Sequence, residues 1–254
     1  MRTADWTESV SVLDRVTAVF DAFTEFDEGL GVSELARRAN LPKSTVSRIA
    51  ADLVEQRFLD RDGDKLFLGV RLFELGQTVE QPRRLRQLAL PVMTELRDAT
   101  GQTVHLAVLE GRDVVFIAIV RGEPTAKPLA RVGGRLPAHA TALGKAMLAF
   151  SPPDVVERVA YGGLVRRTPH TISEPSALLE ELAEVHRSGM AAEREECASD
   201  RSCIASPILG LAGAPIAAIS VAGSVEAMMP ERIAPAVRAA AMTLSRRIGG
   251  GRIH

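Results

Sequence analysis

Residues 39–50, ANLPKSTVSRIA, bring together side chains that can bind phosphate groups or the edges of nucleic-acid bases. The polar members of this stretch are Lys43, Ser44, Thr45, Ser47 and Arg48. If the stretch is helical and Val46 points to the core, a turn of about 100° per residue places Ser44 and Arg48 almost opposite it. An ordinary helix would spread such residues over its outer face, so their concentration at a helix start indicates a binding surface.

A small, hydroxylated and basic helix face suits the major groove of DNA, which is about 12 Å wide. In that groove Arg48 can pair with O6 and N7 of guanine, while Ser44 and Thr45 can contact phosphates or bases. The N–H groups of the first helical turn also favour a phosphate. The alternative interpretation is a small helical domain that contacts other proteins and exposes a polar face to water.

The overall charge balance does not favour DNA. The chain has a formal net charge of −1, and residues 1–80 contain 10 Lys and Arg against 15 Asp and Glu. Residues 35–48, however, contain four basic residues (Arg37, Arg38, Lys43 and Arg48) and no acidic one. The local charge matters more for binding a polyanion than the net charge of the chain, so this basic segment still favours DNA binding.

The elements around the patch are expected in a definite order. Apolar spacing predicts a helix over residues 9–25, and after a glycine-containing break Ser33 is expected to cap a short helix that ends near Ala39. Pro42 suits the first position of the next helix, predicted to run to Gln56. The buried stripe of that helix is expected to be Val46, Ile49, Ala50 and Leu53.

A hairpin completes this part of the chain. In RFLDRDGDKLFLG, two short apolar runs surround Asp62-Gly63, a strong hairpin signal. Arg61 and Lys65 flank the tip and can touch the DNA backbone or minor groove. Helix, short helix, tight turn, helix and hairpin predict a winged helix-turn-helix. Its expected DNA contacts are Ser33, Arg37, Arg38, Lys43, Ser44, Thr45, Ser47, Arg48, Arg61 and Lys65.

The rest of the chain follows a different pattern. Residues 77–86 predict a linker that enters a helix, which Pro91 should end or kink near Leu90. Strands are predicted in TVHLAVLEGRDVVFIAIV (two, about a Gly turn), KPLARV, CIASPIL and PIAAISVAG, and helices in TALGKAMLAF, SALLEELAEVHRSG and residues 230–248. Strand pairs mixed with helices predict an α+β fold with helices packed on an antiparallel sheet. The expected domains are a winged helix-turn-helix domain at 1–76, a linker helix region at 77–100 and a second domain at 101–254.

Several classes of protein are not expected. Cys197 and Cys203 make neither a disulfide framework nor a zinc site, the histidines lack metal-ligand spacing, and LGK (143–145) lacks the glycines of a P-loop. We therefore expect no catalytic site, no cofactor and no metal. The first residues lack an apolar signal stretch, and proline and glycine interrupt the most apolar segment, 204–225, so no membrane span is expected and a reducing cytoplasm fits best.

Four local expectations concern residues and short segments of the second domain. His139 is expected to order its loop, Lys145 to be solvated or paired locally, and the charged stretch 193–196 to face water at a strand edge or in a loop. Period-two alternation places Ile216, Ala218, Ser220 and Ala222 on one face of a strand. These small side chains either leave room for a ligand beside the sheet or let a helix pack closely.

The segment GVSELARRANLPKSTVSRIAADLVEQRFLDRDGDKLFLGVRLFELG resembles the DNA-binding domain of the IclR family of bacterial transcriptional regulators. LPAHATALGKAMLAF, TPHTI and GMAAEREECASDRSCIASPILGLAGAPIAAISVAG resemble that family's effector domain, so the likeness spans nearly the whole chain in order. The resemblance implies a dimer or dimer of dimers and a pseudo-palindromic operator in double-stranded DNA. It also implies a small organic ligand in a C-terminal domain of GAF-like fold.

Carried over by motif, the resemblance places the effector pocket at Ala142, Leu143, Glu193, Cys203, Ser220 and Ala222. Ala222 departs from the family, where another serine is common, so a less polar ligand or a different pose is expected. Ser220, the Cys203 thiol and backbone N–H groups at 141–144 can hold a carboxylate. Glu193 opposes an anion unless it is protonated, turned away or in contact with a ligand hydroxyl.

Three hypotheses follow. The first is a ligand-responsive DNA-binding regulator, expected to be a repressor that senses an organic or aromatic acid. The second is an enzyme with a GAF-like domain, for instance a thiol-dependent reductase that uses Cys203 or Cys197, although no paired acid, base or resolving thiol is evident. The third is a scaffold protein with a degenerate winged helix.

Overall fold

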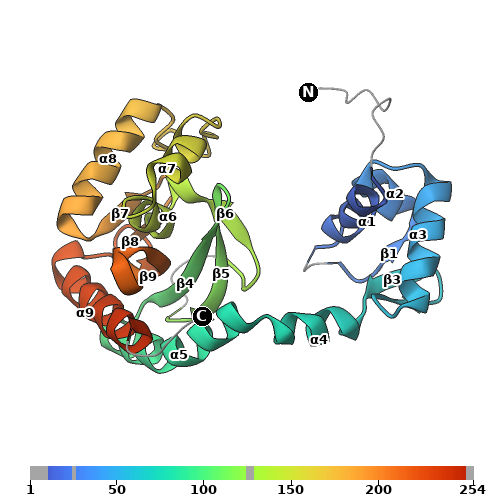
Figure 1. Cartoon of the computed structure of the whole chain (residues 1–254), viewed down its shortest axis with the longest axis horizontal. Helices are drawn as coiled ribbons and strands as arrows, with labels where there is room; N and C mark the ends of the chain where they lie inside the picture. The colour runs from blue at the N-terminus through green and yellow to red at the C-terminus, as the bar shows by residue number, and fades with distance from the viewer. Residues whose placement is uncertain (1–10, 25–26, 124–128, 250–254) are drawn as a thin grey trace. The chain divides into compact units, whose positions relative to one another are not determined.

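The computed structural model describes residues 11–24, 27–123 and 129–249. The chain divides into two compact units, residues 1–80 and 81–254 (Figure 1). The helix predicted as a linker therefore falls almost entirely in the second unit. Its apolar side chains pack in the core of that unit, which explains the assignment.

The first unit is a winged helix-turn-helix. Its elements are α1 (Val12–Asp21), β1 (Leu30–Gly31), α2 (Val32–Ala39), α3 (Lys43–Glu55), β2 (Leu59–Asp62), β3 (Lys65–Leu68) and α4 (Val70–Thr78). The strands form an antiparallel sheet in the order β1-β3-β2. Side chains of α1, α2, α3 and the sheet form one apolar core. The predicted ends of the first helix, residues 9–10 and 25, lie outside the described residues.

Local signals set most of the boundaries, with small corrections. The prediction that Ser33 caps α2 is wrong, because pairing with Lys65 holds Gly31 in an extended conformation and the helix begins directly after it. Asn40 ends α2 in the left-handed conformation, at φ 52°. Pro42 precedes the first helical residue of α3 instead of occupying it.

The hairpin turn lies one residue later than predicted. Asp62 pairs with Lys65, so the two turn residues are Gly63 and Asp64. Gly63 has a φ of +58°, which suits glycine in a tight turn.

The second unit combines one sheet with five α-helices among its described residues. Its elements are α5 (Glu80–Thr100), β4 (Thr103–Glu110), β5 (Asp113–Val120), β6 (Arg135–Pro137), α6 (Ala142–Leu148), α7 (Pro153–Ala160), α8 (Pro175–Ser188), β7 (Ala191–Arg194), β8 (Ser202–Leu209), β9 (Pro215–Gly223) and α9 (Pro230–Gly249), with short 3-10 turns at Ala138–Ala140 and Leu211–Gly213. The sheet is antiparallel in the order β6-β5-β4-β9-β8-β7. In the described part of the chain, no helix has the length and apolar character that crossing a membrane requires.

The sheet separates two apolar cores. α5 and α9 pack on one face, with buried residues such as Met93, Leu106, Ile219 and Leu244. α6, α7 and α8 cover the other face (Figure 1), where Phe116, Met147 and Leu178 are buried. The predicted α+β fold with an antiparallel sheet is confirmed.

Three predictions for this unit are wrong in detail. Of the two effects predicted for Pro91, an end or a kink of the helix, the end is wrong: α5 continues past Pro91, because residues on both sides of the exposed proline pack into the core. Leu129–Val132 form no strand, and the strand beside β5 is β6 instead; Lys127 and Pro128 of the predicted strand lie outside the described residues. Ile216 packs with the α5/α9 core rather than with Ala218, because an irregularity at Ile208/Leu209 shifts the register near the start of β9.

Candidate functional site

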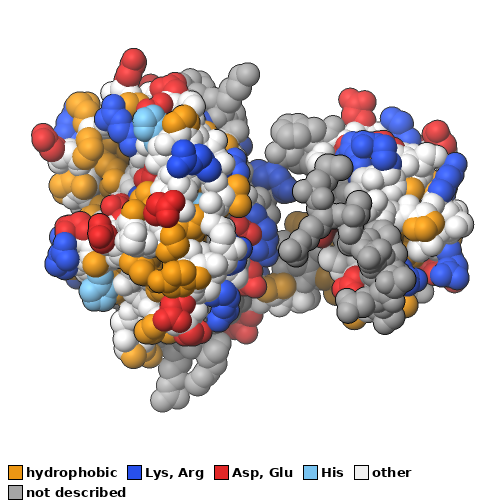
Figure 2. All heavy atoms as spheres, turned by 90° about the horizontal axis from the view of Figure 1, so that it is seen from above, with side chains coloured by type: hydrophobic (Ala, Val, Ile, Leu, Met, Phe, Trp, Pro, Cys, Tyr) orange, Lys and Arg blue, Asp and Glu red, His pale blue; other side chains and the backbone are white. Residues whose placement is uncertain are grey.

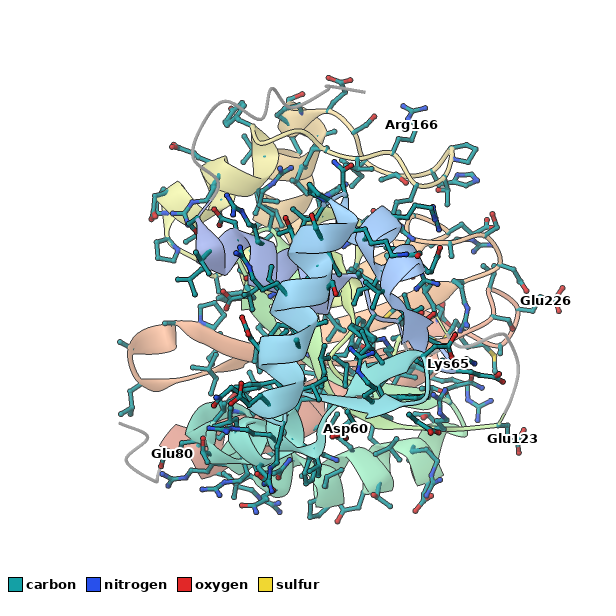
Figure 3. All side chains as sticks on the ribbon, turned by 90° about the vertical axis from the view of Figure 1, so that its right-hand side faces the viewer. Asp60, Lys65, Glu80, Glu123, Arg166 and Glu226 are labelled. Atoms are coloured by element: carbon teal, nitrogen blue, oxygen red, sulfur yellow. The ribbon has the colours of Figure 1, made fainter. Side chains whose placement is uncertain are left out.

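The outward face of α3 is polar and unpaired. Val46, Ile49, Ala50 and Leu53 are buried, which confirms the predicted stripe. Lys43, Ser44, Ser47 and Arg48 are exposed and Thr45 is half-buried. Within the described residues, no ion pair or hydrogen bond occupies the side chain of Lys43 or Arg48. Figure 3 looks onto this unit and shows α3 standing across it, with the β2–β3 hairpin below.

The two arginines of α2 are already paired. Arg37 bonds to Glu34 at 2.7 Å, and Arg38 bonds to Glu34 and to Asp27 at 2.8 Å each. These hydrogen bonds lower the pKa of Glu34 from 4.5 to about 2. Arg38 also donates to the carbonyl of Ala22 at 3.2 Å, so it ties α2 to the end of α1. Carboxylates of the same unit thus offset the charges of both guanidinium groups, which leaves them less available for DNA phosphates.

The hairpin supplies a mixture of charges. Arg61 is exposed on β2, and Lys65 donates from Nζ to the carbonyl of Glu28 at 2.9 Å, which ties β3 to the loop before β1. Asp60 and Lys65, labelled in Figure 3, lie on the two paired strands. On the face drawn in Figure 2, basic and acidic side chains are interspersed over both units. The side chains left for a phosphate backbone are therefore chiefly those of α3 and Arg61, with Ser33 exposed on α2.

A cavity of about 190 Å³ lies in the second unit between the sheet and the start of α6. Much of its wall is apolar and comes from Phe116, Leu129, Leu136 and Leu143. Of the predicted pocket residues, those that line it are Ala142, Leu143, Glu193, Cys203 and Ala222. Ser220 does not line it.

Strand register explains which residues meet in the cavity. One row across the sheet runs from Glu193 on β7 through Cys203 on β8 and Ala222 on β9 to Thr103 on β4. The next row places Ser220 between Ala205 and His105. Ser220 is fully buried there, beside the Cys203 thiol.

Two arginines and a histidine that sequence patterns did not single out for the pocket also line the cavity. Arg121 follows β5 and is exposed, whereas Arg201 is half-buried just before β8. The Nη2 atom of Arg201 is buried and finds no hydrogen-bond partner in the part of the chain described. Burial, together with the charges of Arg201 and Arg121, lowers the pKa of His105 from 6.5 to about 4, so its imidazole is neutral.

Glu193 is the buried acid of the cavity. Burial is the main reason that its pKa rises from 4.5 to about 7, and the neighbouring Glu196 carboxylate also raises it. Its Oε2 accepts the backbone N–H of Glu196 at 3.1 Å. The expectation that residues 193–196 face water is wrong for these two glutamates, which are 5% and 8% exposed.

Lys145 explains how Glu196 can be buried. Its side chain is 1% exposed, and its Nζ lies 2.7 Å from Glu196 and 2.9 Å from Glu181. The prediction of a solvated or locally paired lysine is therefore wrong, because its partners lie 36 and 51 residues away in the chain. His139, in contrast, is buried and hydrogen-bonds through Nε2 to the carbonyl of Val165 at 3.2 Å, which accords with a loop-ordering role.

The two cysteines that line the cavity do not suit thiol chemistry. Burial raises the pKa of Cys197 to about 11 and that of Cys203 higher still, so neither forms a thiolate near neutral pH. Among the described residues, no group of three His, Cys, Asp or Glu side chains is placed to hold a metal ion.

Two family models and several known proteins match this chain. The model described as "IclR helix-turn-helix domain" matches residues 12–63, and "Bacterial transcriptional regulator IclR C-terminal" matches residues 77–246. The HTH-type transcriptional regulator XynR of Escherichia coli is 32% identical over 215 residues, covering 84% of this chain and 85% of that protein. The transcriptional repressor IclR of the same species is 31% identical over 236 residues, covering 91% and 86%.

A solved structure is also similar. The crystal structure of an IclR homolog complexed with 4-hydroxybenzoate, from Microbacterium hydrocarbonoxydans, has 33% sequence identity and a TM-score of 0.86. The match covers 95% of this chain and 100% of that chain.

Proposed function

The chain belongs to the IclR family of bacterial transcriptional regulators, and from that premise we propose that it is a repressor whose second unit senses a small organic acid. The family joins a helix-turn-helix domain to an effector-binding C-terminal domain, and its members are regulators rather than enzymes. The name of one relative, a transcriptional repressor, supports the sign of regulation.

The observation that carries the proposal is the unpaired polar face of α3. Lys43, Ser44, Ser47 and Arg48 are exposed on the side of the helix away from the core, without side-chain partners in the part of the chain that the structure describes. In a helix-turn-helix protein this second helix enters the major groove, and the wing steadies it on the backbone. Because the operator would lie on the bacterial chromosome, the proposed function implies a cytoplasmic protein.

A symmetric oligomer is part of the proposal. A dimer would present two α3 helices to two half-sites of a pseudo-palindromic operator. Large apolar side chains that remain exposed in the first unit support self-association: Val12 and Leu13 on α1, Val70 and Phe73 on α4, and Val79 directly after it.

The acid effector rests on the composition of the cavity. Arg121 and Arg201 line a mainly apolar space and form no ion pair with the described residues. The relative crystallised with 4-hydroxybenzoate carries a ligand of this class. A six-stranded antiparallel sheet with helices on both faces supports the GAF-like assignment for the domain that holds the cavity.

The DNA-binding part is tested by footprinting and titration with the promoter beside the protein's own gene. Arg48→Ala should cost roughly 1–3 kcal/mol and relax the sequence preference, because the guanidinium would contact base edges. Arg61→Ala should weaken binding evenly across sequences and reduce the salt slope, because Arg61 is exposed on β2 whereas Lys65 already bonds to the Glu28 carbonyl. Arg37→Ala is the matched control, since Glu34 already pairs with that arginine.

The results separate the possibilities. Equal protection of one operator by wild type and Arg48→Ala would refute the role given to Arg48. Absence of selective retention of any promoter fragment at physiological salt would refute the regulator assignment. Release of the operator on addition of an acid effector supports repression, whereas tighter binding with the acid would refute a simple repressor.

A further inference from the structure

The carboxyl group of Glu193 forms part of the cavity wall where β7 meets α6. Its side chain is buried and lines the cavity, and its cross-strand partner on β8 is Cys203. β7 and α8 both pack against α6, and Figure 1 shows the three elements on the same side of the second unit. A ligand that fills the cavity therefore meets the carboxyl group of Glu193.

The carboxyl groups around Glu193 outnumber the cations that could neutralise them. Lys145 on α6 is shared by Glu196 and Glu181, at 2.7 and 2.9 Å. In the described chain no ion pair joins Glu193 to a cation, and its Oε2 accepts the backbone N–H of Glu196 at 3.1 Å instead. Burying a carboxylate without a paired cation is costly, so this arrangement favours a protonated Glu193.

Arg201 is the second cation at this end of the sheet. Its carbonyl accepts the backbone N–H of Glu195 at 2.6 Å, which places Arg201 across from β7, two residues beyond Glu193. The half-buried side chain of Arg201 lines the cavity, and its Nη2 finds no hydrogen-bond partner among the described residues. An acid effector bound to this guanidinium group would leave no cation for Glu193, whereas Arg121 lies across the sheet, after β5.

Two cysteines and a histidine in the same cavity stay neutral near pH 7. Burial raises the pKa of Cys197 to about 11 and that of Cys203 further, and it lowers the pKa of His105 to about 4. Arg167 bonds to the carbonyl of Cys197 at 3.0 Å and does not line the cavity. Burial raises the pKa of Glu193 to about 7, so this carboxyl group can gain or lose its proton near neutral pH.

We propose that Glu193 binds an acid effector in its protonated form, donating a hydrogen bond to the effector's carboxylate, so that the protein takes up about one proton with each acid. The proton comes from the solvent and stays on the Glu193 carboxyl group. This inference rests on the proposed acid-sensing function and makes that function dependent on pH. Two ionised carboxylates in one small cavity would instead repel each other where salt screens little.

Isothermal titration calorimetry of the full-length protein measures the proton uptake. Benzoate, 4-hydroxybenzoate and hexanoate, whose carboxyl groups are ionised throughout the range, are titrated at about pH 6 and about pH 8. At about pH 8 each titration is run in phosphate and in Tris, which release different heats when they supply a proton. Free Glu193 is mostly ionised at that pH, so we expect uptake of about one proton per acid and about tenfold weaker binding than at pH 6.

Two variants assign the proton to one residue. Glu193→Gln keeps the size of the side chain and is neutral at every pH, and its amide N–H can replace the O–H donor. It should abolish the proton uptake and bind acids at pH 8 about as tightly as wild type does at pH 6, a gain that misfolding cannot produce. Glu184→Gln is the matched control, because Glu184 pairs with Arg187 and does not line the cavity.

Each outcome decides one point. Acid binding by wild type without proton uptake at pH 8, or with equal affinity at both pH values, leaves acid sensing intact and overturns the role of Glu193. Uptake that persists in Glu193→Gln also overturns it, since another group would then carry the proton. If none of the three acids binds wild type at pH 6, the acid-sensor proposal fails and this inference fails with it.

Discussion

Replacing Lys145 by methionine should destabilise the second unit strongly. The lysine side chain is 1% exposed and pairs with Glu196, whose own side chain is 10% exposed. Methionine fills a similar volume but leaves the Glu196 carboxylate buried without its cation. Removing one partner of a buried pair costs about 3–5 kcal/mol. For a unit of this size, each kcal/mol lowers the midpoint by about 2–4 °C, so a fall of roughly 6–20 °C is expected.

The pH dependence provides a second signature of the same change. Burial raises the pKa of Glu196, and the Lys145 charge opposes that rise. Without the lysine the carboxyl group should take up a proton more readily, which removes the buried charge. The loss of stability in Lys145→Met should therefore be smaller at about pH 5.5 than at about pH 8.

Differential scanning calorimetry of the full chain can follow the transition of the second unit. The double variant Lys145→Met/Glu196→Leu should recover most of the loss, because replacing a buried ion pair by apolar side chains is often neutral. Arg158→Met is the control: its pair with Asp154 is 62% and 70% exposed, so less than about 1 kcal/mol is expected. A fall of under about 2 °C in Lys145→Met, or no recovery in the double variant, would show that the pair is not effectively buried.

Two further variants probe the packing of α6 and the wall of the cavity. Gly144→Ala should destabilise the second unit by at least about 1–3 kcal/mol in thermal unfolding, because a Cβ there would lie 2.1 Å from the Ala138 carbonyl oxygen. The control is Gly76→Ala in α4, where the space around the glycine is open. That variant should be neutral or stabilising by up to about 1 kcal/mol. Glu193→Gln should become more stabilising relative to wild type as pH rises from about 4.5 to 7, by at most about 3 kcal/mol, because the folded state holds the Glu193 proton more tightly than the unfolded chain does. A stability difference between Gln and Glu at residue 193 that stays constant with pH would contradict the burial of that carboxyl group.

The face of α3 could be predicted because its signal is local. Burial of Val46, Ile49 and Leu53 follows from helical spacing alone, and the polar residues between them must then face outward. The hairpin was predictable for the same reason, and its turn was misplaced by only one residue.

Contacts between distant elements could not be predicted in this way. Arg38 was predicted as a DNA contact, but Asp27, in the loop between α1 and β1, lies 2.8 Å from its guanidinium group and offsets its charge. Helix periodicity places Arg38 on a face without stating what lies opposite. The pocket has the same limit: alternation puts Thr103 and His105 on one side of β4, yet only the register with β9 brings them to Ala222 and Ser220.

Charged residues are normally assigned to the surface because burying an isolated charge is costly. Lys145, Glu193 and Glu196 break that rule together, and they do so beside the cavity. Lys145 stabilises Glu196, and the Glu196 backbone N–H holds the Glu193 carboxyl group at the cavity wall. These costly burials therefore place one ionisable side chain, that of Glu193, in the cavity wall, where it can contact a ligand. Departures from local sequence rules are expected at functional sites, and here the buried Glu193 carboxyl group lies in the wall of the cavity.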